Sequence, residues 1–121
     1  MKTLAILLLV LIVLWLVMER PQGAAPSVKV LYRQAARYAV ASTQDEAPVI
    51  KVLHANYAMG YLMAIKDIVT ASEFKMATGK DLLNFEQEIA RIQDGATLSL
   101  VEICPELKPK EDPELLKAMY A

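Results

Sequence analysis

Residues Leu4–Met18 read LAILLLVLIVLWLVM, an unbroken run of fifteen apolar side chains. Lys2 stands before the run, and Glu19 and Arg20 follow it. Twelve of the fifteen are Leu, Ile or Val, whose transfer into a bilayer is favourable. Its length lies between that of a signal-peptide core and that of a full membrane span. The run predicts a hydrophobic membrane anchor over residues 1–20, with bilayer contacts at Leu4, Leu8, Leu11, Trp15 and Met18.

The residues after the run favour a retained anchor over a cleaved signal peptide. A cleavage site needs small residues in an A-x-A-like arrangement. Cleavage after Ala25 would leave Pro26 beside the cut, and cleavage after Ala24 would place the large Gln22 at the other selective position. We therefore expect a single transmembrane signal-anchor helix. The alternative is a secreted protein from which residues 1–25 are removed.

Basic residues gather just after the hydrophobic run. Residues 27–44 carry three basic and no acidic side chains, whereas residues 45–121 carry eight basic and thirteen acidic ones. Because Lys and Arg near a span favour the cytoplasmic side, we expect the C-terminal domain on the cytoplasmic, or interior, side. A basic section beside the membrane with an acidic section beyond it fits anionic lipid head groups better than nucleic acid. The three cations are spaced by four residues on one helix face, and an ordinary solvated face is the alternative interpretation. The candidate head-group contacts are Arg20, Lys29, Arg33 and Arg37.

The rest of the chain shows helix signals only, so the expected fold class is all-α. No segment alternates with period two for long enough to be a strand. Residues 21–26 contain two prolines and predict a short linker, and residues 27–105 predict a helical bundle domain. Residues 106–121 predict a charged tail with a terminal amphipathic helix over 113–120. The anchor is thus followed by a small bundle of three main and two short helices.

The first two bundle helices are expected over about 27–41 and 49–69. Ser27 suits an N-cap for the first, and the sequence TQDE at 43–46 matches a capping box before the second. The first helix has one apolar face, formed by Val28, Leu31, Ala35 and Tyr38. The second is apolar on most sides, which is typical of a central helix. Its main stripe is Ile50, Leu53, Tyr57, Tyr61, Ala64 and Ile68.

A short helix and a long one follow. A second capping box lies at 70–73, Gly79 is expected to end the short helix, and Asp81 is expected to cap the long one. Gly95 weakens the middle of the long helix by about 1 kcal/mol relative to Ala, and Pro105 ends it. The apolar heptad positions of the long helix are Leu82, Phe85, Ile89, Ile92, Ala96, Ser99 and Ile103.

Gly60 and Ala64 form a pair of small residues one helical turn apart. Such a pair permits close approach of two helices, either between chains or, as is commoner, inside one bundle. Asn56 lies one turn earlier. The candidate helix-packing residues are Asn56, Gly60, Ala64, Phe85, Ile89 and Ile92.

No motif points to catalysis, to a cofactor or to a metal. The chain has no phosphate-binding loop, dinucleotide-binding glycine pattern, zinc signature or nucleophile elbow. A single cysteine, Cys104, excludes an internal disulfide and a cysteine-based zinc site, and a single histidine, His54, excludes a histidine-rich site. A Cys104–His54 nucleophilic pair would need hydrogen-bond contact. Cysteine at the end of an apolar helix is more commonly a small buried hydrophobe.

The expected function is therefore that of a non-enzymatic, single-pass membrane protein with a helical assembly or scaffolding domain. Its expected partners are the lipid bilayer and either other proteins or copies of itself, and nucleic acid is not expected. This organisation is similar to that of small membrane proteins of virions and of accessory subunits of membrane complexes, although no motif carries the similarity. The alternative is a secreted helical binding protein with an apolar pocket, lined by Tyr57, Tyr61, Met59 and Met63. Outside that alternative, no small-molecule ligand is expected.

Overall fold

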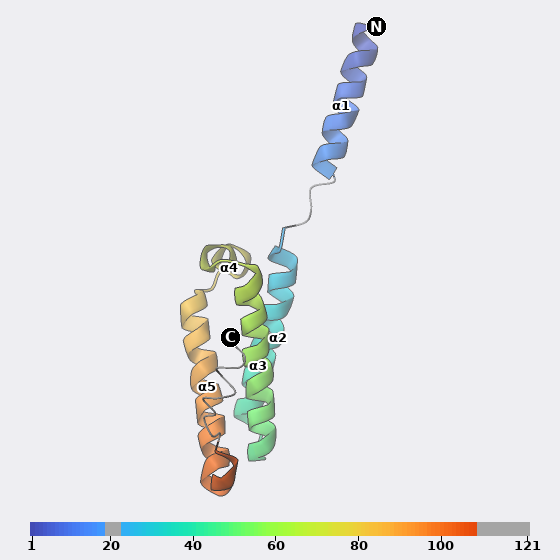
Figure 1. The fold of residues 1–121 in the computed structure, drawn as a ribbon. Helices are drawn as coiled ribbons and strands as arrows, with labels where there is room; N and C mark the ends of the chain where they lie inside the picture. Colours follow the sequence, from blue (N-terminus) through green and yellow to red (C-terminus); the bar gives the residue numbers. More distant parts are fainter. Residues whose placement is uncertain (19–22, 109–121) are drawn as a thin grey trace, which may run out of the picture.

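The structure is a computed structural model that describes residues 1–18 and 23–108. Within these two ranges it contains five α-helices, one short 3-10 helix and no strand (Figure 1). The elements are α1 (Lys2–Met18), α2 (Ala25–Gln44), α3 (Pro48–Ile68), α4 (Ala71–Thr78), α5 (Leu82–Ile103) and η1 (Pro105–Leu107). The predicted all-α class and helical bundle are confirmed. The terminal helix predicted over 113–120 lies outside the described residues.

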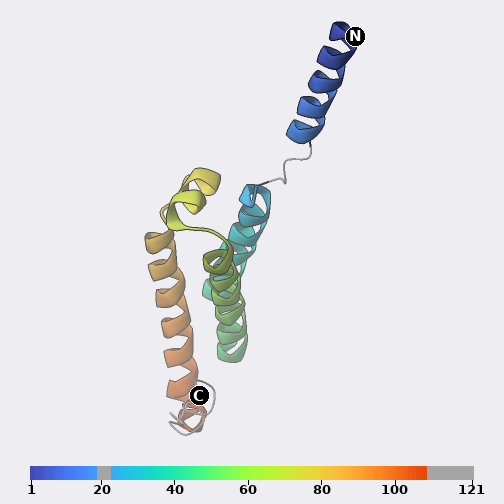
Figure 2. The same cartoon turned by 45° about the horizontal axis from the view of Figure 1, so that its top comes forward.

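The bundle consists of the three long helices α2, α3 and α5, with α4 across one end. Figures 1 and 2 show the long helices side by side, and α4 connecting the end of α3 to the start of α5. Three rings join α2, α4 and α5: the Tyr32 centroid lies 5.8 Å from that of Phe74 and 5.0 Å from that of Phe85. The core cluster is Val28, Ala39, Ala58, Leu62, Ile65, Phe74, Leu82 and Ile89.

Helix α2 begins two residues before the predicted N-cap Ser27. Ala24 is the N-cap, without a side-chain hydrogen bond, and Pro26 lies in the first turn. Proline is favoured there because its fixed φ suits the helix and its missing N–H leaves no intrahelical bond unmade. The last two residues of the predicted linker, Ala25 and Pro26, therefore belong to α2.

The capping box predicted at 43–46 is wrong. Thr43 lies inside α2, where its hydroxyl donates to the Val40 carbonyl at 2.7 Å. Helix α3 begins instead at Pro48, with Ala47 as an N-cap in extended conformation and without a side-chain cap. A residue before proline avoids the helical region, so the break between the helices falls at Ala47 rather than at Thr43.

The signals around α4 and α5 are confirmed. Thr70 and Glu73 form the predicted capping box, and Gly79 ends α4 in the left-handed region at φ 71°. The Asp81 carboxylate accepts from the Asn84 N–H and caps α5. Gly95 does not interrupt α5, which runs to Ile103. A cost of about 1 kcal/mol for glycine is smaller than what the buried side chains on both sides of it contribute.

Helix α3 is turned so that most of its predicted main stripe faces outward. Its buried residues are Ala55, Ala58, Leu62 and Ile65. Ile50, Leu53, Tyr57 and Ile68 of the stripe are instead 40%, 41%, 47% and 49% exposed. The two buried alanines explain why this side of α3 faces the core. Small side chains let α3 approach α2, which itself buries Ala35 and Ala39.

The heptad pattern predicted for α5 describes its buried side over most of its length. Leu82, Ile89 and Ala96 are buried, and Phe85 and Ile92 pack against the core cluster. Ile103, the last heptad position, is 64% exposed, because it lies beyond the core cluster.

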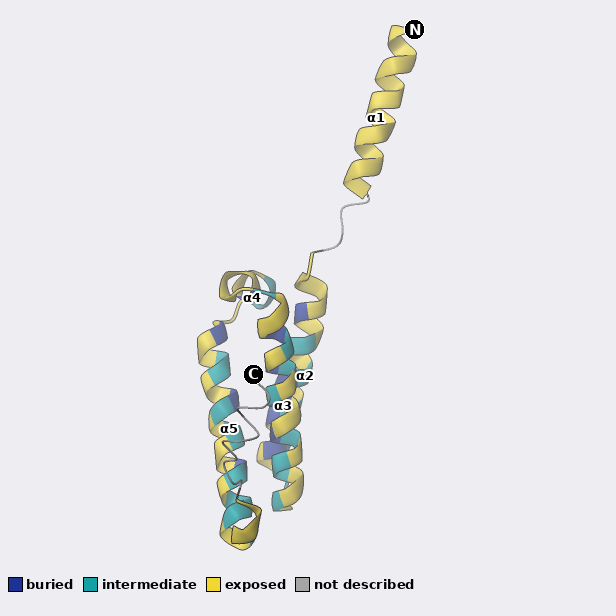
Figure 3. Ribbon diagram, viewed as in Figure 1, coloured by how far each residue is buried: buried dark blue, intermediate teal, exposed yellow. Residues whose placement is uncertain are grey.

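Helix α1 has no buried residue (Figure 3). In the two described ranges, no helix combines the length and the apolar character that a membrane crossing requires. The predicted transmembrane signal-anchor helix is therefore not supported.

Truncation of Phe74 tests whether α4 closes the core. Phe74 is fully buried between Tyr32 and Phe85, so Phe74→Ala should lower the free energy of unfolding by about 3–5 kcal/mol. Met76 on the same helix is 82% exposed, and Met76→Ala should change it by less than about 0.5 kcal/mol. Denaturant titration of both variants measures the difference. Equal losses in the free energy of unfolding for the two variants would show that Phe74 of α4 is not part of the core.

Acidification tests the capping box of α4. The Thr70 backbone N–H donates to the Glu73 carboxylate at 2.7 Å, and this bond, then the bond with the Thr70 hydroxyl, lowers the pKa of Glu73 below its ordinary value of 4.5. A lowered folded-state pKa means that Glu73 stabilises the fold above pH 4.5 and loses this effect as pH falls through the folded value. Glu73→Gln should thus lower the melting temperature above pH 4.5, and the difference should shrink as the pH falls below that value. A pH-independent difference would contradict this role.

Candidate functional site

The outward side of α2 carries a row of cations that we call the basic ridge: Lys29, Arg33 and Arg37. All three are exposed, and their spacing of four residues places them on one side of α2, opposite buried Val28 and Ala35. The ion pairs among the described residues are His54–Asp45, Lys66–Glu86 and Arg91–Glu88, none of which involves the ridge. Arg20, the fourth predicted head-group contact, lies outside the described residues.

Two shallow hollows lie along the basic ridge. One is lined by Tyr32, Arg33, Ala36, Arg37, Val40, Ala41 and Gln44. The other is lined by Lys29, Tyr32, Arg33, Ala77 and Thr78. Neither lining contains a carboxylate. Val30 and Val40 are 54% and 53% exposed on the same helix. The surface of α2 therefore combines positive charge with apolar side chains, which suits an anionic and partly apolar surface.

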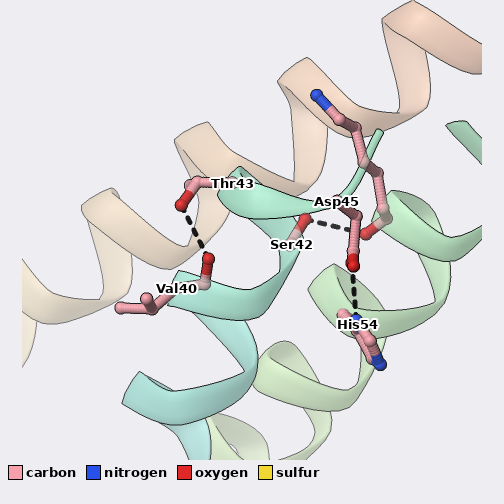
Figure 4. Close-up of polar contacts among 6 residues, drawn as sticks. Val40, Ser42, Thr43, Asp45 and His54 are labelled. Atoms are coloured by element: carbon pink, nitrogen blue, oxygen red, sulfur yellow. Dashed lines mark hydrogen bonds and ion pairs between the residues drawn. The ribbon is translucent and has the colours of Figure 1, made fainter. Parts of the chain in front are cut away.

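Polar contacts fix the turn between α2 and α3 (Figure 4). The buried Ser42 hydroxyl donates to the Lys51 carbonyl at 2.7 Å, and so ties the last turn of α2 to the first turn of α3. Asp45 follows α2, and its Oδ2 lies 2.6 Å from Nδ1 of His54. The sequence predicted Asp45 in a capping box and carried no signal for either contact, because each joins residues nine positions apart across a turn.

Aromatic side chains cover the boundary between α2 and α3. The Tyr38 ring is stacked on Tyr61 at 5.8 Å and lies 5.2 Å from Tyr57 and 5.6 Å from His54, centroid to centroid. The Arg37 guanidinium lies 5.9 Å from the Tyr38 ring centroid. These contacts place Tyr57 and Tyr61 on the side of α3 that faces α2.

The apolar pocket predicted for the alternative function is not formed by its four residues. Tyr57 and Tyr61 lie beside Tyr38, whereas Met59 packs against the core cluster and Met63 is 53% exposed. The two methionines lie two positions away from the tyrosines along α3, so the helix directs the two pairs to different sides.

The exposed side of α3 is largely apolar, with Tyr57 at its border toward α2 and the exposed Asp67 beside Gly60 and Ala64. We call it the outer face of α3 and define it by Ile50, Leu53, Tyr57, Gly60, Ala64 and Ile68. Gly60 is exposed, and a Cβ built on it meets no atom within 4 Å. Tight packing inside the bundle therefore does not describe Gly60. The other helix-packing candidates, Phe85, Ile89 and Ile92, lie in or against the core cluster.

Asn56 lies at the edge of the outer face of α3. Its Oδ1 accepts from Gln93 Nε2 at 2.8 Å, and this bond links α3 to α5. The Asn56 side chain is exposed.

The outward side of α5 is acidic. Glu88 pairs with Arg91 one turn later, and this hydrogen bond lowers the pKa of the Glu88 carboxyl and raises the pKa of Arg91. Asp94 and Glu102 are exposed on the same helix. The bundle thus presents a basic side on α2, an apolar one on α3 and an acidic one on α5.

In the described part of the chain, the residues considered for a nucleophilic pair or a metal site do not lie together. Nδ1 of His54 is directed to Asp45, and no hydrogen bond joins His54 to the half-buried Cys104. Within the described residues, no three His, Cys, Asp or Glu side chains lie close enough to hold a metal ion.

Comparison with protein-family models, with curated proteins and with solved structures finds no match to this chain.

Removal of one hydroxyl tests the turn between α2 and α3. Ser42→Ala should lower the free energy of unfolding by about 1 kcal/mol, because a buried interhelical hydrogen bond is lost. Thr43→Ala is the matched control, because the exposed Thr43 hydroxyl bonds only within its own helix, and its effect should stay below about 0.5 kcal/mol. Thermal unfolding of both variants measures this. Equal losses would show that the Ser42–Lys51 contact does not hold the turn.

Proposed function

We propose that this is a non-enzymatic membrane-attached protein whose helical bundle serves assembly or scaffolding at the membrane surface. The observation that supports it most directly is the exposure of α1. The large apolar side chains of residues 4–18 are between 48% and 83% exposed. So large a continuous apolar surface needs a cover, because soluble monomers rarely expose patches above a few hundred Å².

A lipid bilayer would bury the apolar side chains on every side of α1. Twelve Leu, Ile and Val residues favour insertion by roughly 4–7 kcal/mol in total. A helix of 17 residues is about 25 Å long, against about 30 Å for a typical hydrocarbon core. In the single-pass signal-anchor arrangement that we propose, local thinning of the bilayer and extension of Lys2 toward the head groups compensate for this difference. The surplus of Lys and Arg after the helix supports placing the bundle on the cytoplasmic, or interior, side.

The basic ridge supports the same proposal from the bundle side. Only residues 19–24 separate α1 from α2, so the two helix ends are at most about 25 Å apart. When α1 lies in a bilayer, the first turns of α2 are therefore close to its surface. There, each Lys or Arg contributes about 1 kcal/mol of attraction to anionic lipid.

An assembly role fits the remaining surfaces better than catalysis does. His54 is engaged by Asp45, whereas an enzyme of the nucleophilic class needs a nucleophile within hydrogen-bond reach of its base. The outer face of α3 offers the bundle an apolar surface for a protein partner.

The intact mass and N-terminal residue of the protein from its native host test the attachment. After alkaline extraction of the membranes, we expect the chain in the pellet with Met1 as its first residue. A soluble chain that begins near Ala25 or Pro26 would overturn the proposal and favour the secreted alternative.

Charge reversal tests the basic ridge separately. The full-length chain should partition into vesicles that contain phosphatidylserine up to about 100-fold better than into phosphatidylcholine vesicles at low salt, from about 1 kcal/mol for each of three cations. Changing Lys29, Arg33 and Arg37 to Glu should abolish this preference. The matched control changes the exposed Lys80, Arg91 and Lys108 to Glu, which alters net charge equally and should have a smaller effect. Equal loss in both variants would show that net charge, and not the ridge, governs binding.

A further inference from the structure

We propose that residues 113–120 dock as a helix in a hollow between α2 and α5 and so add a fourth long-axis helix to the bundle. The occupant of this hollow is thus a segment of the same chain that follows the described residues. Docking of this segment rests on the hollow, on the length of chain after α5 and on charge, and it does not depend on the proposed membrane attachment.

The hollow between α2 and α5 lies beside the turn that joins α2 to α3. It has a volume of about 180 Å³ and is lined by Ser42, Thr43, Lys51, Arg91, Ile92, Gly95, Ala96 and Ser99. A Cβ built on Gly95 meets no atom within 4 Å. Most of the lining side chains are small, whereas α2 and α5 meet further along through the rings of Tyr32 and Phe85, whose centroids are 5.0 Å apart. The end beside the turn therefore has room for large side chains from another segment, since helices pack densely only where their side chains interdigitate.

The apolar side of α5 extends beyond the helices that cover it. Ile92 packs against the core cluster, but Ile103, on the same heptad side, is 64% exposed. Leu107 of η1 is 54% exposed. In a helical bundle, a neighbouring helix covers such positions. Residues 113–120 are the nearest segment along the chain that can supply one.

The chain after α5 is long enough to return to the hollow. The described residues end at Lys108, directly after η1. Residues 109–112 span at most about 14 Å, and a helix of residues 113–120 is about 12 Å long. The stretch of α5 from Gly95 to Ile103 has the same length of about 12 Å. A helix that runs antiparallel to α5 therefore covers both the hollow and the exposed Ile103.

The composition of residues 113–120, PELLKAMY, suits this position. Asp112 and Pro113 suit an N-cap and a first-turn proline. In a helix, Lys117 lies on one side and the large apolar side chains share the other. These apolar residues are Leu115, Leu116, Met119 and Tyr120. Such an amphipathic helix buries its apolar side in a groove and leaves its polar side in water.

Charge favours the direction in which the segment starts beside the turn. Glu111, Asp112 and Glu114 surround the start of the segment. Lys51 lines the hollow from the first turn of α3, at the end of the bundle where α5 also ends (Figure 1). None of the ion pairs among the described residues involves Lys51. Opposite charges at this end of the hollow therefore favour the antiparallel direction.

Alkylation of single cysteines in the full-length chain tests the docking. In a Cys104→Ser background, Leu116→Cys and Lys117→Cys place neighbouring thiols on opposite sides of the proposed helix. In phosphatidylcholine vesicles, we expect iodoacetamide to alkylate the thiol of Leu116→Cys at least tenfold more slowly than that of Lys117→Cys. Equal rates would overturn the proposal.

Filling the hollow distinguishes docking there from protection by lipid or by another copy. Gly95→Phe adds a ring where the backbone is open and improves helix propensity, so the bundle should keep its melting temperature. The ring should displace the segment and remove the tenfold difference between the two thiols. Leu83→Phe is the matched control, because Leu83 is 61% exposed at the start of α5, and it should leave the difference unchanged. Protection that survives Gly95→Phe, or that rises with the protein-to-lipid ratio, would contradict docking in this hollow.

Disulfide formation tests the antiparallel arrangement. A helix that starts beside Ile103 brings Leu116 next to Ser99. In the Cys104→Ser background, Ser99→Cys together with Leu116→Cys should form a disulfide within one chain. Val101→Cys together with Leu116→Cys should not, because Val101 lies on the opposite side of α5 from Ser99. Equal yields from the two pairs, or disulfides between chains only, would overturn the proposal.

Discussion

Burial of one side of α3 is the interaction on which the rest of the structure depends. Ala55, Ala58, Leu62 and Ile65 are almost completely buried, and α3 packs along both α2 and α5. The alanines set the approach to α2, and the larger Leu62 and Ile65 join the core cluster that Phe74 of α4 closes. Because α3 is apolar nearly all round, burying this side leaves the opposite side open. The outer face of α3 is thus a consequence of how the core is packed.

The chain therefore exposes two apolar surfaces of different kinds. Helix α1 is apolar all round and has no buried residue, which matches a solvent of hydrocarbon. The outer face of α3 is one-sided, includes Gly60 and has Asn56 at its edge, and such residues match another helix better. Between them in sequence lies α2, whose basic ridge matches anionic head groups. We therefore infer a protein that is held at a membrane by α1 and α2 and that uses α3 to assemble.

Local sequence signals predicted the helices well where a single residue sets the geometry. The capping box at Thr70, the left-handed Gly79 and the Asp81 cap are short-range features that the structure confirms. The start of α3 was mispredicted because Pro48, not the hydroxyl of Thr43, fixes the break. The exposed side of α3 and the Asp45–His54 contact were beyond prediction, since each depends on packing between helices. The basic ridge could be predicted from the sequence because its residues are spaced by four. The open space around Gly60 could not, because it depends on where the neighbouring helices lie.

Trp15 offers the most direct test of the central claim that α1 lies in lipid. It is the only tryptophan in the chain and lies near the end of α1, so its fluorescence reports on that helix alone. In vesicles, the emission should shift to the blue, resist quenching by iodide, and be quenched more by bromine near the head-group end of the lipid chains than near their methyl ends. Emission typical of indole in water, with quenching by iodide and none by brominated lipid, would contradict the membrane attachment on which the account rests.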